Sequence, residues 1–315
     1  MLNYGKAVTP VVRSSFAIAA LLFCAGSSIV GAQIDYRNID SGRPVRIGDA
    51  TPTELKSLEL SLATARFDKL SLGRYRLQLE PRIAYGIFPR TEFSMRAPVY
   101  FYERSLSPRA GVGGLGLGGE HQLNIESLSF PSVAIAGELF VPMGPAALRN
   151  SYSIKGLATR TLPAVRLHVN ASYGTFSFRR PPAGERIIPP IHGPCVFQTP
   201  GDAFGGVRAL CSTAPAAPVA TGAAELGPIV TRGQWIAGLA VDKSLPLRSM
   251  LLIADVFAQK YEGIGRPVDW TAEIGGRAQL NRGFVVDAAI GRLFTGESKA
   301  WFLNVGTTLT RPLHL

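Results

Sequence analysis

The stretch AVRLHVNASYGTF, residues 164–176, alternates between two kinds of side chain. Its odd positions, from Val165 to Tyr173, are apolar or small, and its even positions, from Arg166 to Gly174, are polar or glycine. Successive side chains of a strand point to opposite faces, so this period of two predicts a β-strand with one apolar face and one wet face. The fold class depends on whether the apolar face of this strand contacts lipid or a protein core, and on whether its polar face contacts a lumen or bulk water.

Three further segments separate apolar from charged residues in the same way: RYRLQLEPRIAY (74–85), TEFSMRAPVYF (91–101) and VDWTAEIGGRAQLN (268–281). Along the whole chain we expect twelve strands, near residues 56–66, 73–87, 92–103, 111–124, 131–142, 151–161, 164–177, 233–243, 250–261, 268–281, 284–294 and 300–311. An even number of alternating strands of roughly ten residues is typical of a bacterial outer-membrane barrel.

The connections between the expected strands support the same fold. Counted from a periplasmic start, the turns from even to odd strands are short, such as NRG at 281–283, and the other connections include longer loops. This asymmetry is typical of outer-membrane barrels, in which closure also leaves no unpaired sheet edge in hydrocarbon. We therefore predict an all-β, antiparallel up-and-down transmembrane barrel over residues 55–315. A soluble β-sandwich, with its charged face in bulk water, is the alternative.

Composition narrows the classes of protein. The chain has 315 residues, a net charge of +11, 46% hydrophobic residues and 17% charged residues. A disordered chain is excluded, because so large an apolar share can form a core. The Lys and Arg residues are scattered, with no basic run and no nucleic-acid-binding motif, so we expect no nucleic-acid partner.

The first residues predict export. Lys6 and Arg13 precede an apolar run, FAIAALLFCAG, and VGA at residues 30–32 is a small-residue cleavage site. Residues 1–32 are therefore predicted to be a signal peptide, followed by an N-terminal periplasmic segment over residues 33–54. A membrane anchor is the competing interpretation, but the run is shorter than the ~20 residues that a helical span needs. The expected location is the outer membrane of a Gram-negative-type bacterium.

The longest connection, residues 178–232, is rich in Pro, Ala and Gly and contains Cys195 and Cys211. After removal of a signal peptide these are the two remaining cysteines, and an even pair in an exported protein most simply forms one disulfide. We predict an extracellular loop. It could cover or constrict the barrel mouth, or it could be a flexible surface loop that the disulfide staples against proteolysis.

The polar faces of the strands would line the inside of the barrel. The candidates for this lining are Arg74, Arg76, Glu80, Arg82, Glu92, Arg96, Glu120, Glu138, Arg166, His168, Asp255, Glu273, Arg277 and Asp287. Both charge signs are abundant, which fits either a ring that selects a permeating solute or a lumen filled by cross-strand ion pairs. Twelve strands lie between the side-chain-filled barrel of eight and the aqueous channel of sixteen, and predict a narrow passage or a plugged pore.

Aromatic residues near the strand ends would suit interfacial girdles. The candidates are Tyr85, Phe88, Phe176, Trp235, Trp270, Phe294 and Trp301. Ordinary core packing is the alternative for any one of them.

Motifs for catalysis are weak. His168 and Ser172 share a face, as a hydrolase would require, but the sequence contains no G-x-S-x-G turn. The glycine-rich GVGGLGLGGEHQL, residues 111–123, lacks the Lys and Ser/Thr of a phosphate loop and fits a strand whose glycines let the sheet bend. We predict no enzyme activity, no catalytic residue, no metal site and no cofactor.

Five segments occur in an order seen in one group of outer-membrane proteins: GVGGLGLGGEHQL, PSVAIAGELFVPMG, VRLHVNASYG, WIAGLAVDKSLPLRSMLLIADVFAQ and AQLNRGFVVDAAIGRLF. Over about residues 60–311 the chain resembles the MetA-pathway of phenol degradation family. The resemblance implies an outer-membrane barrel that takes up small solutes, including aromatic or hydrophobic compounds, and it brings no catalytic residues.

We therefore expect a porin-like channel or transporter for small solutes. Its partners would be outer-membrane lipid, a small-molecule solute and, during biogenesis, the barrel-assembly machinery. The alternatives are a non-transporting surface barrel whose long loop binds a partner, and an outer-membrane hydrolase.

Overall fold

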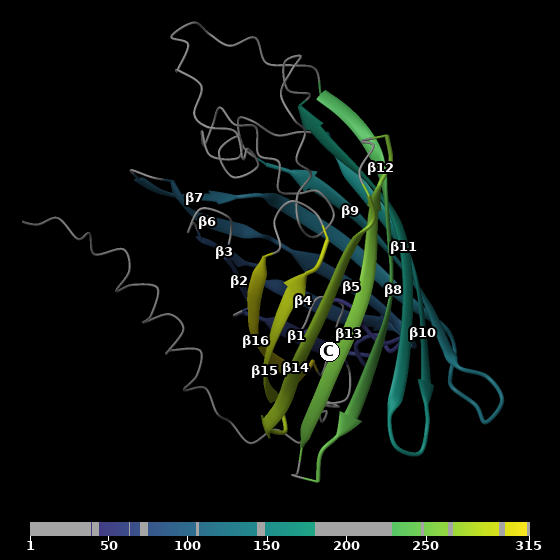
Figure 1. Ribbon diagram of the computed structural model, residues 1–315. Helices are drawn as coiled ribbons and strands as arrows, with labels where there is room; N and C mark the ends of the chain where they lie inside the picture. The colour runs from purple at the N-terminus through teal and green to yellow at the C-terminus, as the bar shows by residue number, and fades with distance from the viewer. Residues whose placement is uncertain are drawn as a thin grey trace, which may run out of the picture. The chain divides into compact units, whose positions relative to one another are not determined.

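The computed structural model describes residues 39, 44–62, 64–69, 75–104, 107–143, 149–179, 229–246, 249–263, 267–295 and 300–313. Their strand segments join into one antiparallel sheet (Figure 1). The segments are β1 (Ser57–Ser61), β2 (Ala65–Lys69), β3 (Tyr75–Leu79), β4 (Arg82–Phe88), β5 (Thr91–Arg96), β6 (Val99–Arg104), β7 (Ser107–Val112), β8 (Gly114–Asn124), β9 (Ser132–Pro142), β10 (Ser151–Thr161), β11 (Arg166–Arg179), β12 (Ile229–Ser244), β13 (Met250–Tyr261), β14 (Asp269–Asn281), β15 (Phe284–Leu293) and β16 (Trp301–Pro312).

These segments make twelve strands, as predicted, because the first eight are halves of four interrupted strands. β1 and β2 are consecutive halves of the first strand, since both pair with β16. β3 and β4 are halves of the second strand, and β5 and β6 are halves of the third, because β3 pairs with β6 and β4 pairs with β5. β7 and β8 are halves of the fourth strand, because they pair with β6 and β5. The pairing of the first strand with the last closes the sheet into a barrel.

The interruptions follow one line across neighbouring strands. The N–H of Ala97 donates to the carbonyl of Pro81 at 3.1 Å, and the N–H of Gly113 donates to that of Pro98 at 2.8 Å. Proline has no N–H to give to a sheet ladder, which accounts for the breaks at Pro81 and Pro98. Gly114 begins β8 with a φ of 151°, a backbone region that favours glycine.

The two ends of the barrel differ. At one end, here called the turn end, the strands are joined by tight turns such as residues 89–90 and 282–283. At the other end, the loop end, most connections fall outside the described residues. β11 and β12 extend further than predicted, to the register pair Arg179↔Ile229, so the loop predicted at 178–232 is shorter at both ends. The signal peptide and the two cysteines predicted to form a disulfide lie outside the described residues.

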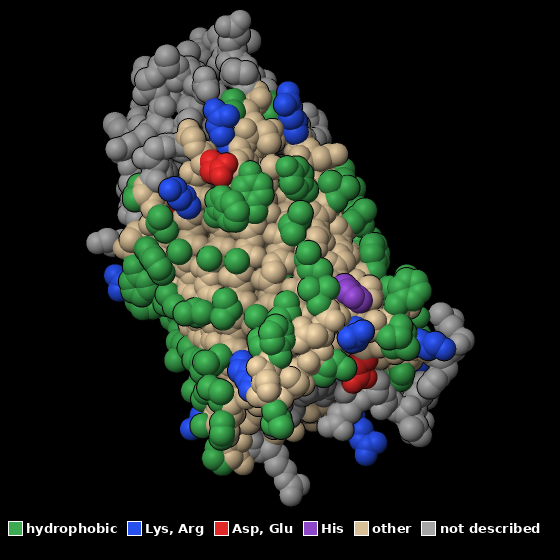
Figure 2. Space-filling model, turned by 90° about the vertical axis from the view of Figure 1, so that its right-hand side faces the viewer, with side chains coloured by type: hydrophobic (Ala, Val, Ile, Leu, Met, Phe, Trp, Pro, Cys, Tyr) green, Lys and Arg blue, Asp and Glu red, His purple; other side chains and the backbone are tan. Residues whose placement is uncertain are grey.

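The outer face of the barrel is apolar (Figure 2). Alternate strand residues face outward there, and the large exposed ones are mainly aliphatic or aromatic: Ile83, Phe93, Met95, Ile135, Leu139, Ile154, Leu167, Val169, Leu239, Val241, Leu252, Val256, Ile274, Ile290 and Leu303. In the part of the chain that the structure describes, no helix is long and apolar enough to cross a membrane.

The predicted aromatic girdle is partly correct. Trp235, Trp270 and Trp301 are about half exposed on the outer face toward the loop end. Phe176 follows the alternative of core packing, because it is fully buried inside the barrel with its ring 5.1 Å from that of Tyr261. Phe176 is an even-numbered residue of β11, and the alternation of that strand turns its even residues inward.

Residues 44–54, which we call the plug segment, cross the inside of the barrel. The segment has no regular secondary structure, so its backbone polar groups need other partners. Inward-facing side chains supply them: Asp255 Oδ2 accepts the N–H of Ile47 at 3.0 Å, and Thr159 Oγ1 accepts the N–H of Ala50 at 2.9 Å. Glu92 Oε2 accepts the N–H of Thr53 at 3.0 Å.

Apolar contacts hold the same segment. Val45 and the preceding Ile39 lie in a buried cluster with Leu251 and Ile253 of β13. Ile47 lies in a second cluster with Phe257 of the same strand. Burial of a side chain of this size is worth about 1.5–3 kcal/mol, so the contacts stabilise the segment inside the lumen. The sequence placed residues 33–54 in the periplasm ahead of the barrel, whereas the described residues of this range lie within it.

The plug segment leaves the lumen past Gly86 of β4. A Cβ atom at Gly86 would lie 1.9 Å from the carbonyl oxygen of Glu54, so the backbone there has no room for a side chain. We expect Gly86→Ala to destabilise the barrel by about 1–3 kcal/mol, because the chain must shift. Urea unfolding in detergent micelles measures the effect. Gly156→Ala is the control, since nothing lies within 4 Å of that position, and equal losses in both variants would contradict the expectation.

Candidate functional site

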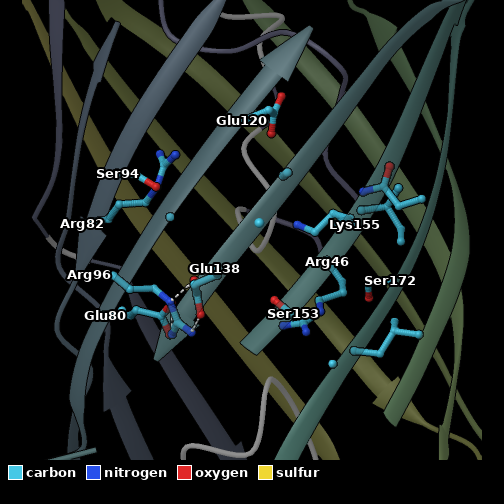
Figure 3. A pocket seen from close by; sticks show the side chains of 18 of the residues that line it. Arg46, Glu80, Arg82, Ser94, Arg96, Glu120, Glu138, Ser153, Lys155 and Ser172 are labelled. Carbon is cyan, nitrogen blue, oxygen red and sulfur yellow. Dashed lines mark hydrogen bonds and ion pairs between the residues drawn. The ribbon is translucent and has the colours of Figure 1, made fainter. Parts of the chain in front are cut away.

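Several inward-facing charges around the plug segment are paired across strands. Arg96 of β5 binds two carboxylates: its Nε lies 2.7 Å from Glu138 Oε2, and its Nη1 lies 3.0 Å from Glu80 Oε1 (Figure 3). Arg82 of β4 binds Glu92 and lies 3.6 Å from Glu59. These contacts agree with the hypothesis of a lumen filled by cross-strand ion pairs.

Two further ion-pair groups lie elsewhere on the inner wall. Asp68, which is 2% exposed, accepts hydrogen bonds from Arg66 and Arg76, both at 2.9 Å. Arg277 and Asp287, which face each other across β14 and β15, lie 3.5 Å apart. A buried charge without a partner destabilises the folded protein, so these ion pairs stabilise the barrel wall and are not available to a solute.

His168 belongs to the anchorage of the plug segment. Its Nε2 lies 2.7 Å from Asp242 Oδ2, and its Nδ1 lies 3.0 Å from Thr159 Oγ1, the hydroxyl that accepts the N–H of Ala50. Arg166 Nη2 lies 2.9 Å from Asp242 Oδ2. The side chains thus form a chain of contacts that ends on the plug segment.

The hydrolase hypothesis gains no support from this group. A hydroxyl, an imidazole and a carboxylate lie in hydrogen-bonding order at Thr159, His168 and Asp242, as in a nucleophile-base-acid triad. However, the hydroxyl is occupied by the backbone of Ala50, and His168 has no exposed surface. A substrate could not reach the hydroxyl without removal of the plug segment.

The inside of the barrel contains a cavity of about 260 Å³. The plug segment bounds it through Arg46, Ile47, Asp49 and Thr51, and strands from β2 around to β12 supply most of the rest. Gly116 and Gly118 face the cavity from β8, and their missing side chains leave space for Arg96 and Ser94, whose atoms lie about 3 Å from where a Cβ would be. The cavity can hold a small solute together with water.

Three charged side chains in this cavity have no partner. Arg46 of the plug segment, Glu120 of β8 and Lys155 of β10 line it without a hydrogen bond or ion pair to any described residue. Burial lowers the pKa of Arg46, an effect that the nearby carboxylates of Glu273 and Glu80 oppose. These three groups are therefore available to a solute.

The structure places the described lining candidates on the inner wall. Those that line the cavity are Glu80, Arg82, Glu92, Arg96, Glu120, Glu138 and Glu273. Those in ion pairs or plug contacts outside the cavity lining are Arg76, Arg166, His168, Asp255, Arg277 and Asp287. Arg74 lies outside the described residues. Glu92 and Asp255 differ from the expectation, since each hydrogen-bonds the plug segment as well as facing the lumen.

The cavity residues of the plug segment, Arg46, Asp49 and Thr51, were not among the residues predicted from the sequence to line the lumen. A usable indication lies in the strand predicted at 250–261, where Leu251, Ile253 and Phe257 alternate with equally apolar residues. A strand that is apolar on both faces needs an apolar partner inside the barrel, and the plug segment is that partner.

Comparisons with known proteins find no match to a family model and no match among curated proteins. The NanC porin is a similar solved structure, 6% identical at a TM-score of 0.48, with 80% of this chain and 98% of that chain covered. The COG4313 outer membrane channel from Pseudomonas putida F1 is 9% identical at 0.48, with 84% and 98% covered. The CymD monoaromatic hydrocarbon channel is 8% identical at 0.42, with 83% and 90% covered. The assignment of a closed barrel is based on the strand pairing and not on these weak similarities.

Proposed function

We propose that the chain is an outer-membrane channel for small polar solutes. The observation that carries this proposal is the division of the barrel wall, which is apolar outside and polar inside around a cavity of about 260 Å³. An apolar outer face is stable against acyl chains, whereas a polar inner face is stable against water and solute. A soluble sandwich would instead bury its apolar face against a second sheet.

The outer membrane is the compartment that this architecture favours. Closed antiparallel barrels with an even number of strands are typical of that membrane, and the sequence resemblance and the signal peptide favour the same location. Outer-membrane lipid and, during biogenesis, the barrel-assembly machinery are then the partners. The proposed role is passage rather than catalysis, because the plug segment covers the Thr159 hydroxyl beside His168.

The lining favours polar over aromatic or hydrophobic solutes. Among the lining residues, four have apolar side chains: Ile39, Ile47, Ala136 and Ile236. The rest of the lining is charged, hydroxyl, amide or glycine. The uptake of aromatic or hydrophobic compounds that the family resemblance implies would require a different path, and the plug segment is the constriction on the path through the lumen.

Swelling of proteoliposomes that contain the full-length protein tests the proposal. We expect swelling in iso-osmotic arabinose and little in the larger sugar raffinose, because the cavity admits only small solutes. Liposomes without protein are the control for leakage. A preparation of folded protein, with the heat-shifted gel mobility of a barrel, that gives neither swelling nor ion conductance would contradict the channel function.

A further inference from the structure

The unpaired charges in the cavity are arranged on one level of the barrel. In the strand register Glu120 is opposite Ala136, and Ala136 is opposite Lys155. The two charged residues are thus two strand spacings apart, about 10 Å between Cα atoms. Only the methyl group of Ala136 stands between them, so the space between the carboxylate and the ammonium belongs to the cavity.

A second cation adjoins Lys155. Arg46 reaches the cavity from the plug segment, and both it and Glu120 lie within electrostatic range of Lys155. In Figure 3 the Lys155 side chain lies between Glu120 on one side and Arg46 on the other. Two hydroxyl groups lie near the cations, since Ser172 is opposite Lys155 in the strand register and Ser153 lines the same cavity.

Two neighbouring carboxylates are bound to other side chains. Glu92, the residue opposite Glu120 on β5, is bound by Arg82 and Thr53. Glu138 is bound by Arg96. Glu273, which also lines the cavity, accepts the backbone N–H of Arg46 and keeps one oxygen without a partner among the described residues. The cavity therefore presents the side chains of Glu120, Lys155 and Arg46 without a direct hydrogen bond or ion pair to the described residues, with Glu273 next to Arg46.

We propose that this cavity is a binding site for a small zwitterion, a solute with a carboxylate and an ammonium group such as a free amino acid. The solute carboxylate lies between Lys155 and Arg46, and its ammonium group faces Glu120. Charge-assisted hydrogen bonds of this kind are stronger than neutral ones, and the Glu120 carboxylate disfavours a purely anionic solute. The inference rests on the proposed channel function and names its solute class.

Alanine and lactate form a matched pair of probes, because lactate has a hydroxyl group where alanine has its ammonium. Saturation-transfer NMR on the full-length protein in detergent micelles measures their binding directly. We expect a saturation signal for alanine and a signal for lactate that is at least severalfold weaker. Glu120→Gln should weaken alanine binding roughly tenfold and remove the preference over lactate, since a hydrogen bond between charged groups is lost. Lys155→Gln should weaken both.

Glu54→Gln and Lys260→Gln are the matched controls, because both side chains are exposed outside the cavity lining. They should leave binding unchanged. Equal binding of alanine and lactate to the wild-type protein, or an unchanged preference in folded Glu120→Gln, would overturn the site. Absence of solute flux with selective alanine binding intact would instead count against the channel function alone.

Discussion

An Ile47→Asp variant is expected to conduct severalfold more current than the wild-type protein in a planar bilayer. The substitution puts a carboxylate into the apolar contact with Phe257 and beside the carboxylate of Asp255, which accepts the N–H of residue 47. Burial of an unpaired charge next to a like charge costs several kcal/mol, more than the local contacts supply. The plug segment should leave its position and widen the passage.

Ile47→Val is the control for this variant, because it keeps an apolar side chain and should conduct like the wild type. Limited trypsin digestion gives a second readout. Release of the plug segment exposes the peptide bond after Arg46, so cleavage there should be faster in Ile47→Asp. An unchanged conductance together with faster cleavage would show that the plug segment does not constrict the passage.

Replacement of Arg96 by Met is expected to lower the free energy of unfolding by about 3 kcal/mol. The guanidinium is 11% exposed and binds Glu138 and Glu80 together, so its loss leaves two carboxylates in the wall without their cation. Urea titration in detergent micelles, followed by the heat-shifted gel mobility of the folded barrel, measures the loss.

The double variant Arg96→Met/Glu138→Met should recover most of this stability. Removal of both members of a buried pair is often nearly neutral, and Glu80 keeps a hydrogen bond from Gln78 at 2.7 Å. Arg282→Met, at an exposed turn, is the control and should change little. If Arg96→Met were as stable as this control, the ion pairs of Arg96 would not contribute to the stability of the barrel.

The alternation of side chains predicted the wall well. Arg166, His168 and Asn170 face inward and Leu167 and Val169 face outward, because one apolar face and one polar face are the physical requirement for a membrane barrel. Pro81 and Pro98 were visible inside predicted strands, yet the strand breaks they cause were missed. Even-numbered residues face inward on both sides of each proline. The alternation of side chains alone therefore could not reveal either break.

Other features needed information from distant parts of the chain. Glu59 and Asp68 are both buried, although nine positions separate them, because the break between β1 and β2 shifts the alternation by one residue. The plug segment has no periodicity of its own. Its position is set by partners such as Thr159 and Asp255, which lie more than 100 residues away in the sequence. Sequence patterns of strands cannot reveal such contacts.

Quenching of tryptophan fluorescence by brominated lipid tests the membrane barrel most directly. All three tryptophans, Trp235, Trp270 and Trp301, are exposed on the outer face near the loop end, where acyl chains and headgroups meet. Wild-type protein in vesicles of lipid brominated near the headgroup end of the acyl chain should lose most of its emission relative to unbrominated vesicles. Equal emission in the two kinds of vesicle would contradict contact between the apolar outer face and lipid.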